Sequence, residues 1–203
     1  MRGALLDRDG VLLLLDEEAL YKKALQLAVR GTGLERSLAV LVRAMREIEE
    51  AVRDLKVRTP LEEEAFWRRL VAKVAQELHL PQAHLLPWRY YRFMKKAPGA
   101  ETLLKALKAR GLKIGVLSNT LPSLRESLAY HGLAHYVDGF FASTSLGVAK
   151  PHPQAFLLAL EGLGLKPEET LYLDDDPENV EAARKLGLRA EVYAVRAPGA
   201  RPR

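Results

Sequence analysis

The spacing of apolar residues changes twice along the chain and predicts two kinds of structure. The first apolar run, Gly3 to Leu6, is short and ends at the polar cluster Asp7-Arg8-Asp9-Gly10. This pattern is typical of a buried strand followed by a turn. From Glu17 to Lys96, apolar residues recur at helical spacing, as between Leu38 and Val52. This second stretch predicts about four helices and no strand.

Local residues mark where the helices of this block begin and end. Thr59 and Glu62 have the spacing of a capping box, and Pro60 stands between them where proline favours the first turn of a helix. The segments Gly31-Thr32-Gly33 and Leu80-Pro81 interrupt the apolar spacing. We therefore expect one helix to begin directly after Thr59.

After Pro98 the pattern alternates between β-rich runs and short helical segments. The β-rich runs lie at residues 113–117, 139–142, 171–173 and 190–195. Such alternation predicts βαβ units and a mostly parallel sheet. The sequence therefore predicts an α/β fold. A Rossmann-like parallel-sheet core, residues 1–15 and 97–203, is interrupted after its first strand by an inserted α-helical domain, residues 16–96.

Composition narrows the class of protein further. The chain has 203 residues, of which 48% are hydrophobic and 28% charged, as in globular proteins. The absence of cysteine excludes disulfides, thiolate metal ligands and cysteine nucleophiles. Asn, Gln and Met are scarce, which is compatible with a thermophilic source.

Charge and hydropathy bear on partners and location. The net charge is +5, but the basic residues form no run with interleaved aromatic residues, so we expect no nucleic-acid partner. The apolar run Val11 to Leu15 is too short to span a bilayer or to serve as a typical signal sequence. We expect a cytoplasmic protein without a membrane partner, and nothing in the sequence predicts its oligomeric state.

Polar residues gather at the ends of the predicted strands. Asp7 and Asp9 follow the first strand, and Ser118 and Asn119 follow the second. Lys150 comes after a loop beyond the third strand, and Asp174 to Asp176 follow the fourth. In an open α/β sheet the ligand crevice lies outside the carboxyl ends of the strands. We expect these groups to converge on one site.

The acidic residues among them point to a metal ion. Several carboxylates in one crevice repel one another and need a cation. Oxygen ligands without His or Cys favour Mg²⁺ over zinc. Taken alone, Asp7 to Gly10 also fits a solvated turn, and Asp176 fits the cap of a helix beginning at Pro177. Their joint occurrence at strand ends favours a site.

Four segments of the chain carry motifs of one known family. They are Asp7-Arg8-Asp9-Gly10-Val11 after an apolar run, Ser118-Asn119 after Ile114 to Leu117, Ser143 to Lys150-Pro151 with Gly147 between them, and Leu171 to Asp175 followed by Asn179. Through these motifs the chain resembles the haloacid dehalogenase superfamily of phosphohydrolases. The resemblance covers residues 1–16 and 97–195. The inserted block lies where that family carries a small helical cap, in the position called C1. Glu64 to Trp67 also resembles caps of the branch with sugar-phosphate phosphatases and the phosphatase domain of epoxide hydrolase.

The resemblance implies a phosphatase that hydrolyses a small phosphorylated metabolite through an aspartyl-phosphate. Asp7 would be the nucleophile. Asp9 would protonate the leaving oxygen and then deprotonate the attacking water. Lys150 and Ser118 would bind the oxygens of the transferred group, and the amide of Asn119 would add a further donor to the phosphate.

The resemblance also implies a magnesium cofactor. Asp7, the backbone carbonyl of Asp9, and Asp175 would hold the ion. The fourth motif often reads Gly-Asp, whereas here Asp174 precedes Asp175, so which of the two contacts the metal is open. Asp175 is preferred, with Asp174 and Asn179 orienting the metal ligands from behind.

Other functions remain open at this stage. A dehalogenase of this family normally lacks the second acid, and Asp9 is present. A phosphomutase of the same fold keeps both acids. From different classes come a non-catalytic phospho-acceptor of signalling and a nucleic-acid-binding protein. The sequence does not identify the substrate, and its polar candidates for substrate contact in the inserted block are Arg43, Arg46, Arg58, Trp67 and Tyr90.

Overall fold

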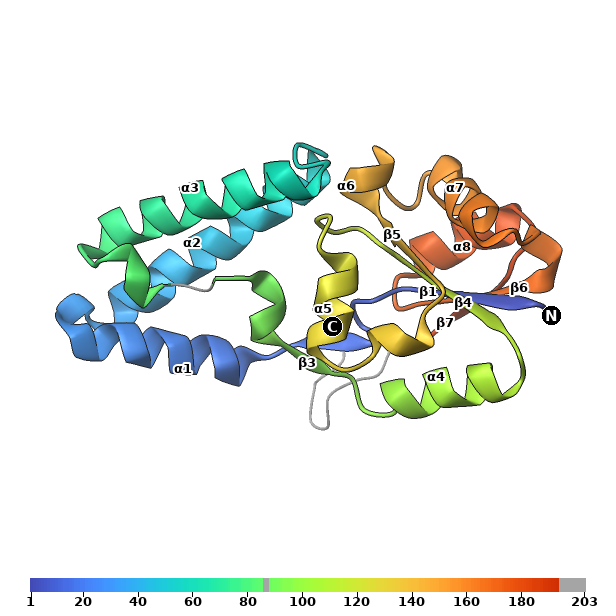
Figure 1. Ribbon diagram of the computed structural model, residues 1–203, viewed down its shortest axis with the longest axis horizontal. Helices are drawn as coiled ribbons and strands as arrows, with labels where there is room; N and C mark the ends of the chain where they lie inside the picture. The colour runs from blue at the N-terminus through green and yellow to red at the C-terminus, as the bar shows by residue number, and fades with distance from the viewer. Residues whose placement is uncertain (86–87, 194–203) are drawn as a thin grey trace.

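The computed structural model describes residues 1–85 and 88–193 and contains a five-stranded parallel sheet (Figure 1). The strand order is β5-β4-β1-β6-β7, and every neighbouring pair is parallel. The strands are β1 (Gly3–Leu6), β4 (Lys113–Ser118), β5 (Gly139–Ala142), β6 (Thr170–Asp174) and β7 (Arg189–Val192). The predicted α/β class is confirmed. The last strand ends at Val192, and residues 194 and 195 of the predicted strand lie outside the described residues.

The central strand β1 determines where the candidate site lies. Leu6 pairs with Val116 of β4 on one side and with Leu173 of β6 on the other. Because the strands are parallel and in this register, Asp7 and Asp174 follow directly at the same edge of the sheet. That edge is where the sequence predicts the ligand crevice.

Helices cover both faces of the sheet, because alternate residues of a strand point to opposite sides. Leu6 belongs to one buried cluster with Leu104 and Leu128, whereas Leu5 belongs to another with Phe156 and Val180. The helices of this core are α4 (Ala100–Ala109), α5 (Leu124–Tyr130), α6 (Ser143–Leu146), α7 (Pro153–Leu163) and α8 (Pro177–Lys185), with short 3₁₀ turns at Ala134–Tyr136 and Pro167–Glu169.

Three long helices form a second body beside the sheet core (Figure 1). They are α1 (Glu17–Leu27), α2 (Leu34–Arg53) and α3 (Pro60–Leu78), with short turns at Ala28–Thr32, Gln82–His84 and Tyr90–Phe93. They have their own apolar cluster, which includes Leu41, Trp67 and Val74. The predicted start of α3 is confirmed, because Thr59 Oγ1 accepts from Glu62 N at 3.2 Å and Glu62 Oε2 accepts from Thr59 N at 3.1 Å.

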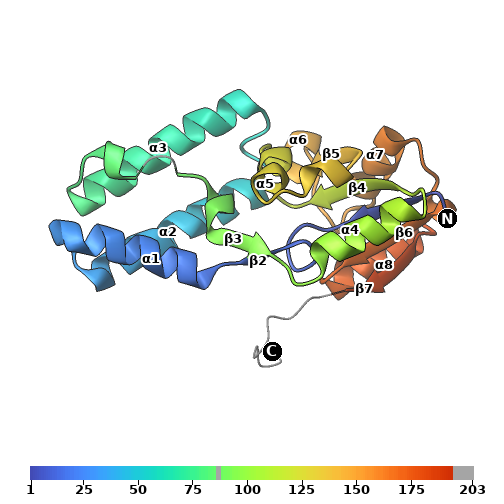
Figure 2. The same ribbon diagram turned by 60° about the horizontal axis from the view of Figure 1, so that its bottom comes forward.

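The prediction of no strand between residues 17 and 96 is wrong. Met94–Lys96 forms β3, which pairs antiparallel with β2 (Leu13–Leu15) in a two-stranded ribbon (Figure 2). Each strand has three residues, too few for a period of two to be visible, and the partners are about 80 positions apart in the sequence. The ribbon lies at both proposed domain boundaries, 15/16 and 96/97, which stay a prediction.

A buried carboxylate connects the inserted helices to the core. Glu63 of α3 is 4% exposed and accepts hydrogen bonds from Ser123 N at 2.8 Å and from Ser123 Oγ at 2.6 Å. Ser123 directly precedes α5, where a carboxylate is favoured by the unpaired amides of the first helical turn. Trp67 Nε1 also donates to Glu63 at 2.9 Å. This contact fixes α3 against the core beside the edge that carries the candidate site.

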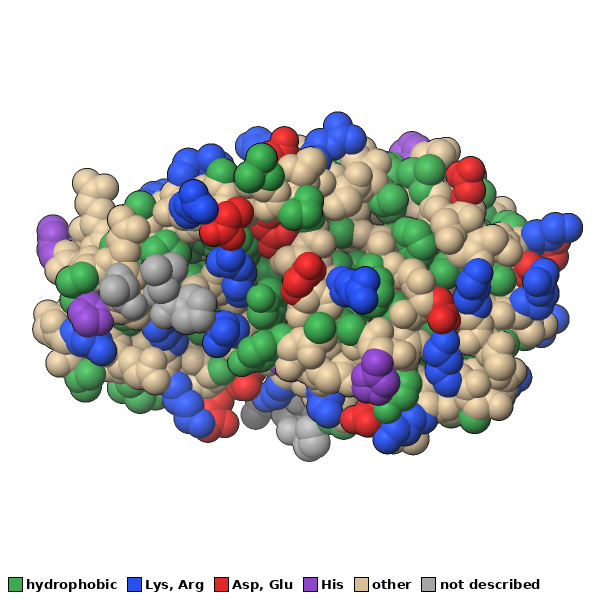
Figure 3. Space-filling view, in the orientation of Figure 1, with side chains coloured by type: hydrophobic (Ala, Val, Ile, Leu, Met, Phe, Trp, Pro, Cys, Tyr) green, Lys and Arg blue, Asp and Glu red, His purple; other side chains and the backbone are tan. Residues whose placement is uncertain are grey.

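Surface charge is dispersed on the face seen in Figure 3. Lysine and arginine side chains lie over both halves of the molecule and alternate with acidic and neutral groups there. The net charge of +5 is therefore not gathered into a basic stripe on that face. None of the helices within residues 1–85 and 88–193 is both long enough and apolar enough to cross a membrane.

Candidate active site

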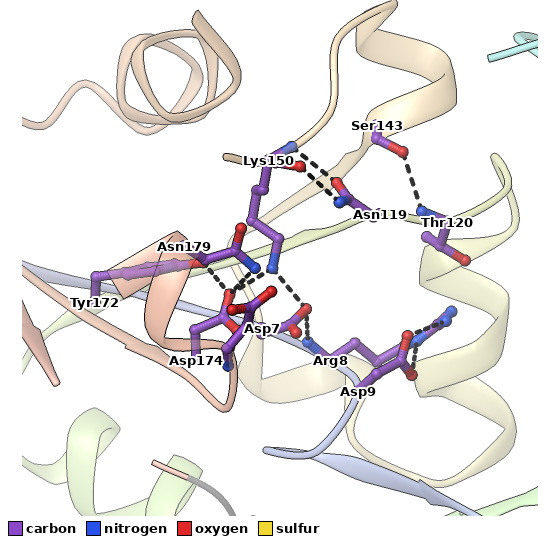
Figure 4. Close-up of polar contacts among 11 residues, drawn as sticks. Asp7, Arg8, Asp9, Asn119, Thr120, Ser143, Lys150, Tyr172, Asp174 and Asn179 are labelled. Atoms are coloured by element: carbon purple, nitrogen blue, oxygen red, sulfur yellow. Dashed lines mark hydrogen bonds and ion pairs between the residues drawn. The ribbon is translucent and has the colours of Figure 1, made fainter. Parts of the chain in front are cut away.

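Three charged side chains meet where β1 and β6 end (Figure 4). Lys150 Nζ lies 3.0 Å from Asp7 Oδ1 and 2.7 Å from Asp174 Oδ2, and all three side chains are almost fully buried. Buried charges are costly unless they are paired, so Lys150 compensates for two carboxylates at once. The expected convergence of strand-end residues is confirmed for these three.

The side-chain amide of Asn119 holds the backbone of Lys150 in place. Lys150 N donates to Asn119 Oδ1 at 2.9 Å, and Asn119 Nδ2 donates to the carbonyl oxygen of Lys150 at 2.9 Å. The pair connects the loop after β4 with the loop after α6. The side chain of Asn119 thus positions the backbone of Lys150, and the predicted contact of the Asn119 amide with phosphate stays a prediction.

Ser118 contributes a buried hydroxyl without a partner. Its side chain is fully buried, and Oγ makes no hydrogen bond to any described residue. Leaving a buried hydroxyl unpaired costs about 1–3 kcal/mol, so such a group is typical of a ligand-binding site. Ser143, which opens the third motif, has a different role, because it accepts a hydrogen bond from Thr120 N at 3.1 Å and so stabilises the loop after β4.

Asp174 is surrounded by donors from the protein. Besides Lys150, the Tyr172 hydroxyl and Asn179 Nδ2, at 3.1 Å, donate to Oδ2, and Asp176 N donates to Oδ1 at 2.8 Å. The sequence analysis did not identify Tyr172. Its position two residues before Asp174 on one strand places both side chains on the same face, and this was the available clue.

A group of carboxylates beside this network could hold a metal ion. Oxygen atoms of Asp7, Asp174 and Asp175 lie within 4.8 Å of one another. Gly10 leaves room for Asp175, because its φ is +76° and a Cβ there would lie 2.4 Å from Asp175 Oδ2. The donors are all oxygens, which suits a hard cation such as Mg²⁺. The residues present therefore fit the predicted cofactor.

The carboxylates of the site carry more negative charge than Lys150 balances, and this shifts their pKa values. Burial raises the pKa of Asp7 to about 7, the charge of Lys150 opposes this rise, and Asp174 and Asp9 add to it. Burial also raises the pKa of Asp175, with a further contribution from Asp174. Burial alone would lower the pKa of Lys150, but Asp7 and Asp174 together raise it. A divalent cation would relieve this excess of negative charge.

Arg8 pairs with Asp9 through two parallel hydrogen bonds. Arg8 Nε lies 2.9 Å from Asp9 Oδ1, and Nη2 lies 2.8 Å from Oδ2. Its remaining nitrogen, Nη1, donates to the Tyr90 hydroxyl, and the guanidinium carbon lies 4.9 Å from the centre of the Tyr90 ring. The structure thus places the Asp9 carboxylate against Arg8, outside the group of three carboxylates. The sequence analysis missed Arg8, although an arginine between two acids after a buried strand is a visible sign.

The polar candidates of the inserted helices lie in different places. Tyr90 contacts the loop after β1 through Arg8. Arg43 pairs with Glu77 at 2.7 Å, and Trp67 donates to Glu63. Arg58 lies against the loop of the third motif, since a Cβ on Gly147 would be 2.4 Å from its Nη2. Of these four, Tyr90 alone contacts Arg8 beside the predicted catalytic acids.

Comparisons with known proteins agree with this geometry. The family model described as haloacid dehalogenase-like hydrolase matches residues 1–187. The chain is 32% identical over 193 residues to phosphatase MT3486 of Mycobacterium tuberculosis, covering 91% of this chain and 83% of that protein. It is 40% identical over 95 residues to a phosphoserine phosphatase of Thermus thermophilus, covering 46% of this chain and 38% of that protein.

Solved structures share the fold at lower identity. A HAD family enzyme from Bacteroides thetaiotaomicron, crystallised as a magnesium complex, has a TM-score of 0.65 at 18% identity, covering 96% of this chain and 94% of that one. At this level of identity the likeness concerns the fold alone. The likeness extends over nearly the whole of both chains.

Proposed function

Because the chain belongs to the haloacid dehalogenase-like hydrolases and is a phosphatase of that family, we propose that it hydrolyses a small organic phosphomonoester with the help of Mg²⁺. The observation that carries the proposal is the ion pair between Asp7 and Lys150 at the edge of the sheet, next to two further carboxylates. The reaction proceeds through a covalent aspartyl-phosphate on Asp7. The substrate is a phosphorylated metabolite, and the protein acts in the cytoplasm.

Asp7 and Lys150 carry the first half of the reaction. An oxygen of Asp7 attacks phosphorus, and the bond to the alcohol oxygen breaks as the aspartyl-phosphate forms. Lys150 neutralises charge on the transferring oxygens, and the Ser118 hydroxyl donates to one of them. The unpaired state of that hydroxyl among the described residues supports this role. Phosphoryl transfer depends mainly on such positioning and charge stabilisation.

Asp9 transfers the protons. It protonates the oxygen of the leaving alcohol and then removes a proton from the water that hydrolyses the aspartyl-phosphate. Its side chain is 45% exposed and lies two residues after the nucleophile, where it can reach both the leaving group and incoming water. The two hydrogen bonds from Arg8 hold the carboxylate in one orientation.

Asp7, the backbone carbonyl of Asp9, and Asp175 would hold Mg²⁺. The ion supplies charge neutralisation for the phosphate and the nucleophile when it is bound. Asp174 and Asn179 orient the site from behind, which is supported by the four protein donors on Asp174 and by the exposure of Asp175. The magnesium complex of the Bacteroides enzyme gives further support.

The test is phosphate release from a panel of sugar phosphates, nucleotides, phosphoglycolate, pyridoxal phosphate and p-nitrophenyl phosphate. We expect turnover with Mg²⁺, loss of turnover after exhaustive chelation, and recovery when Mg²⁺ is restored. Undiminished turnover in chelator would refute the metal requirement. Absence of turnover for every ester in the presence of Mg²⁺ would refute the proposed function.

The covalent step is tested by trapping. Asp9→Asn keeps the nucleophile but lacks the base for the second half-reaction, so its turnover should fall by about 10²–10⁴-fold. With p-nitrophenyl phosphate, whose leaving group hardly needs protonation, a phosphorylated Asp7 should accumulate and be detected by mass spectrometry. Asp7→Asn should show neither turnover nor a phosphorylated protein. A phosphoryl group found on another residue would contradict the mechanism.

A further inference from the structure

A small pocket lies between the catalytic loops and the inserted helices. Its volume is about 190 Å³, and Asp9 forms part of its wall. The loops after β1 and β4 line one side. The opposite side is apolar and consists of residues from the ribbon and from α2: Leu15, Met45, Ile48, Val52 and Met94. Because Asp9 is the proposed proton donor to the leaving oxygen, the pocket beside it is where the alcohol part of the substrate would lie.

Charge is the informative property of this pocket. Among the described residues that line it, Arg8 is the only lysine or arginine. Arg8 is 3% exposed, and the three nitrogens of its guanidinium already contact the Asp9 carboxylate and the Tyr90 hydroxyl. Glu49 adds a second carboxylate to the lining. Counting Arg8, Asp9 and Glu49, the lining carries one positive and two negative charges.

We propose that this pocket binds the alcohol part of the substrate and selects small alcohols without a carboxylate or a second phosphate. This inference rests on the proposed function. A carboxylate in the pocket would face an apolar wall, a guanidinium already paired with Asp9, and the negative charge of Glu49. Burying a charge without a partner is unfavourable, so esters of neutral and amino alcohols are the preferred class. The pocket is also smaller than the roughly 300–1,000 Å³ of sites that take drug-sized ligands, which limits the alcohol to a few carbon atoms.

Two matched pairs of esters test the inference with the purified protein and Mg²⁺. Glycerol 1-phosphate and 3-phosphoglycerate differ chiefly in a hydroxymethyl group against a carboxylate. O-phosphoethanolamine and O-phosphoserine differ only in the added carboxylate. We expect kcat/KM to be roughly tenfold or more higher for the member without the carboxylate in both pairs. Equal values, or a preference for the carboxylated esters, would overturn the inference while leaving the phosphatase proposal intact. No turnover of these esters or of p-nitrophenyl phosphate would overturn both.

A charge reversal in the lining sharpens the test. Glu49→Lys introduces a free ammonium ion into the pocket and should reduce the preference against 3-phosphoglycerate and O-phosphoserine by roughly tenfold. Glu50→Lys is the matched control, because Glu50 is the next residue of α2 and lines a different cavity, between α2 and α3. An equal change of preference in the two variants would show a general effect of net charge and would contradict the pocket as the determinant. An unchanged preference in Glu49→Lys would contradict it as well.

Discussion

The edge of the sheet and the inserted helices bury opposite kinds of side chain. At the edge, Asp7, Arg8, Lys150 and Asp174 are all between 0% and 7% exposed. In the described part of the inserted block, Glu63 is the one charged residue that is buried, and the interior is otherwise mostly aliphatic and aromatic. A network of buried charges tolerates no loss of a single member, because the partner is left unpaired. An apolar wall tolerates exchange of similar side chains. In the proposed function the edge carries the chemistry and the pocket beside it selects the alcohol, so substitutions in the two regions should have different effects.

The largest effect is expected from Lys150→Met. This change removes the cation that faces both Asp7 and Asp174, so turnover should fall about a thousandfold or more for every ester. It also leaves two buried carboxylates without an opposite charge, so the free energy of unfolding of the metal-free protein should fall by about 3–5 kcal/mol in urea titrations. Lys108→Met, which breaks a surface pair with Asp138, is the control and should cost under about 1 kcal/mol. Equal losses in free energy of unfolding for the two variants would contradict the importance of the buried ion pairs at the edge of the sheet.

The pH dependence of stability tests the raised pKa of the buried Asp7 carboxyl at the edge of the sheet. The pKa of Asp7 is raised from 3.8 to about 7 by burial, so between these values the folded state holds a proton that the unfolded state has released. Stability of the metal-free protein should therefore fall as pH rises through this window. Asp7→Asn lacks this titrating carboxyl. The free energy of unfolding of Asp7→Asn minus that of the wild type should therefore rise by on the order of 1 kcal/mol per pH unit between pH 4 and 7. Urea unfolding of both proteins across that pH range measures this difference. A difference that does not change with pH would show that the pKa of Asp7 is not raised in the folded state.

A smaller effect on activity is expected from Asn119. If the side chain acts by positioning Lys150, Asn119→Ala should lower kcat by about 10–100-fold for all esters alike. Asn119→Asp keeps an acceptor for Lys150 N and loses the donor to its carbonyl oxygen, so it should fall between the wild type and Asn119→Ala. Steady-state kinetics separate the alternatives. An unchanged kcat in Asn119→Ala would contradict this positioning role.

The smallest effect is expected where the two regions meet. Glu63→Ala removes the acceptor of Ser123 N, Ser123 Oγ and Trp67 Nε1, and should lower the free energy of unfolding by about 1–3 kcal/mol. The neighbouring Glu64→Ala, which removes an exposed partner of Arg89, should cost under about 1 kcal/mol. Urea titration compares them. Equal losses would mean that the buried contact is not what holds α3 on the core.

Features that depend on neighbours along the chain can be predicted from the sequence alone. Short apolar runs ending in polar clusters identified β1, β4 and β6, and the residues at their ends converge as expected on the carboxyl edge of one sheet. Thr59 and Glu62 identified the start of α3, because a capping box is formed within four residues. The inserted helices were evident from their period. In each case the information lies within a few residues, so no knowledge of the packing was needed.

Which polar groups become partners depends on how distant segments pack together. The sequence contains Asn119, Arg8 and Tyr172 but does not reveal that they hold Lys150, Asp9 and Asp174 respectively. The ribbon of β2 and β3 pairs segments about 80 residues apart, each too short to be recognised alone. The contact of Glu63 with Ser123 depends likewise on how α3 lies on the core. In an unfolded chain a donor or acceptor can meet many partners, and the packing of distant segments decides which of them it keeps.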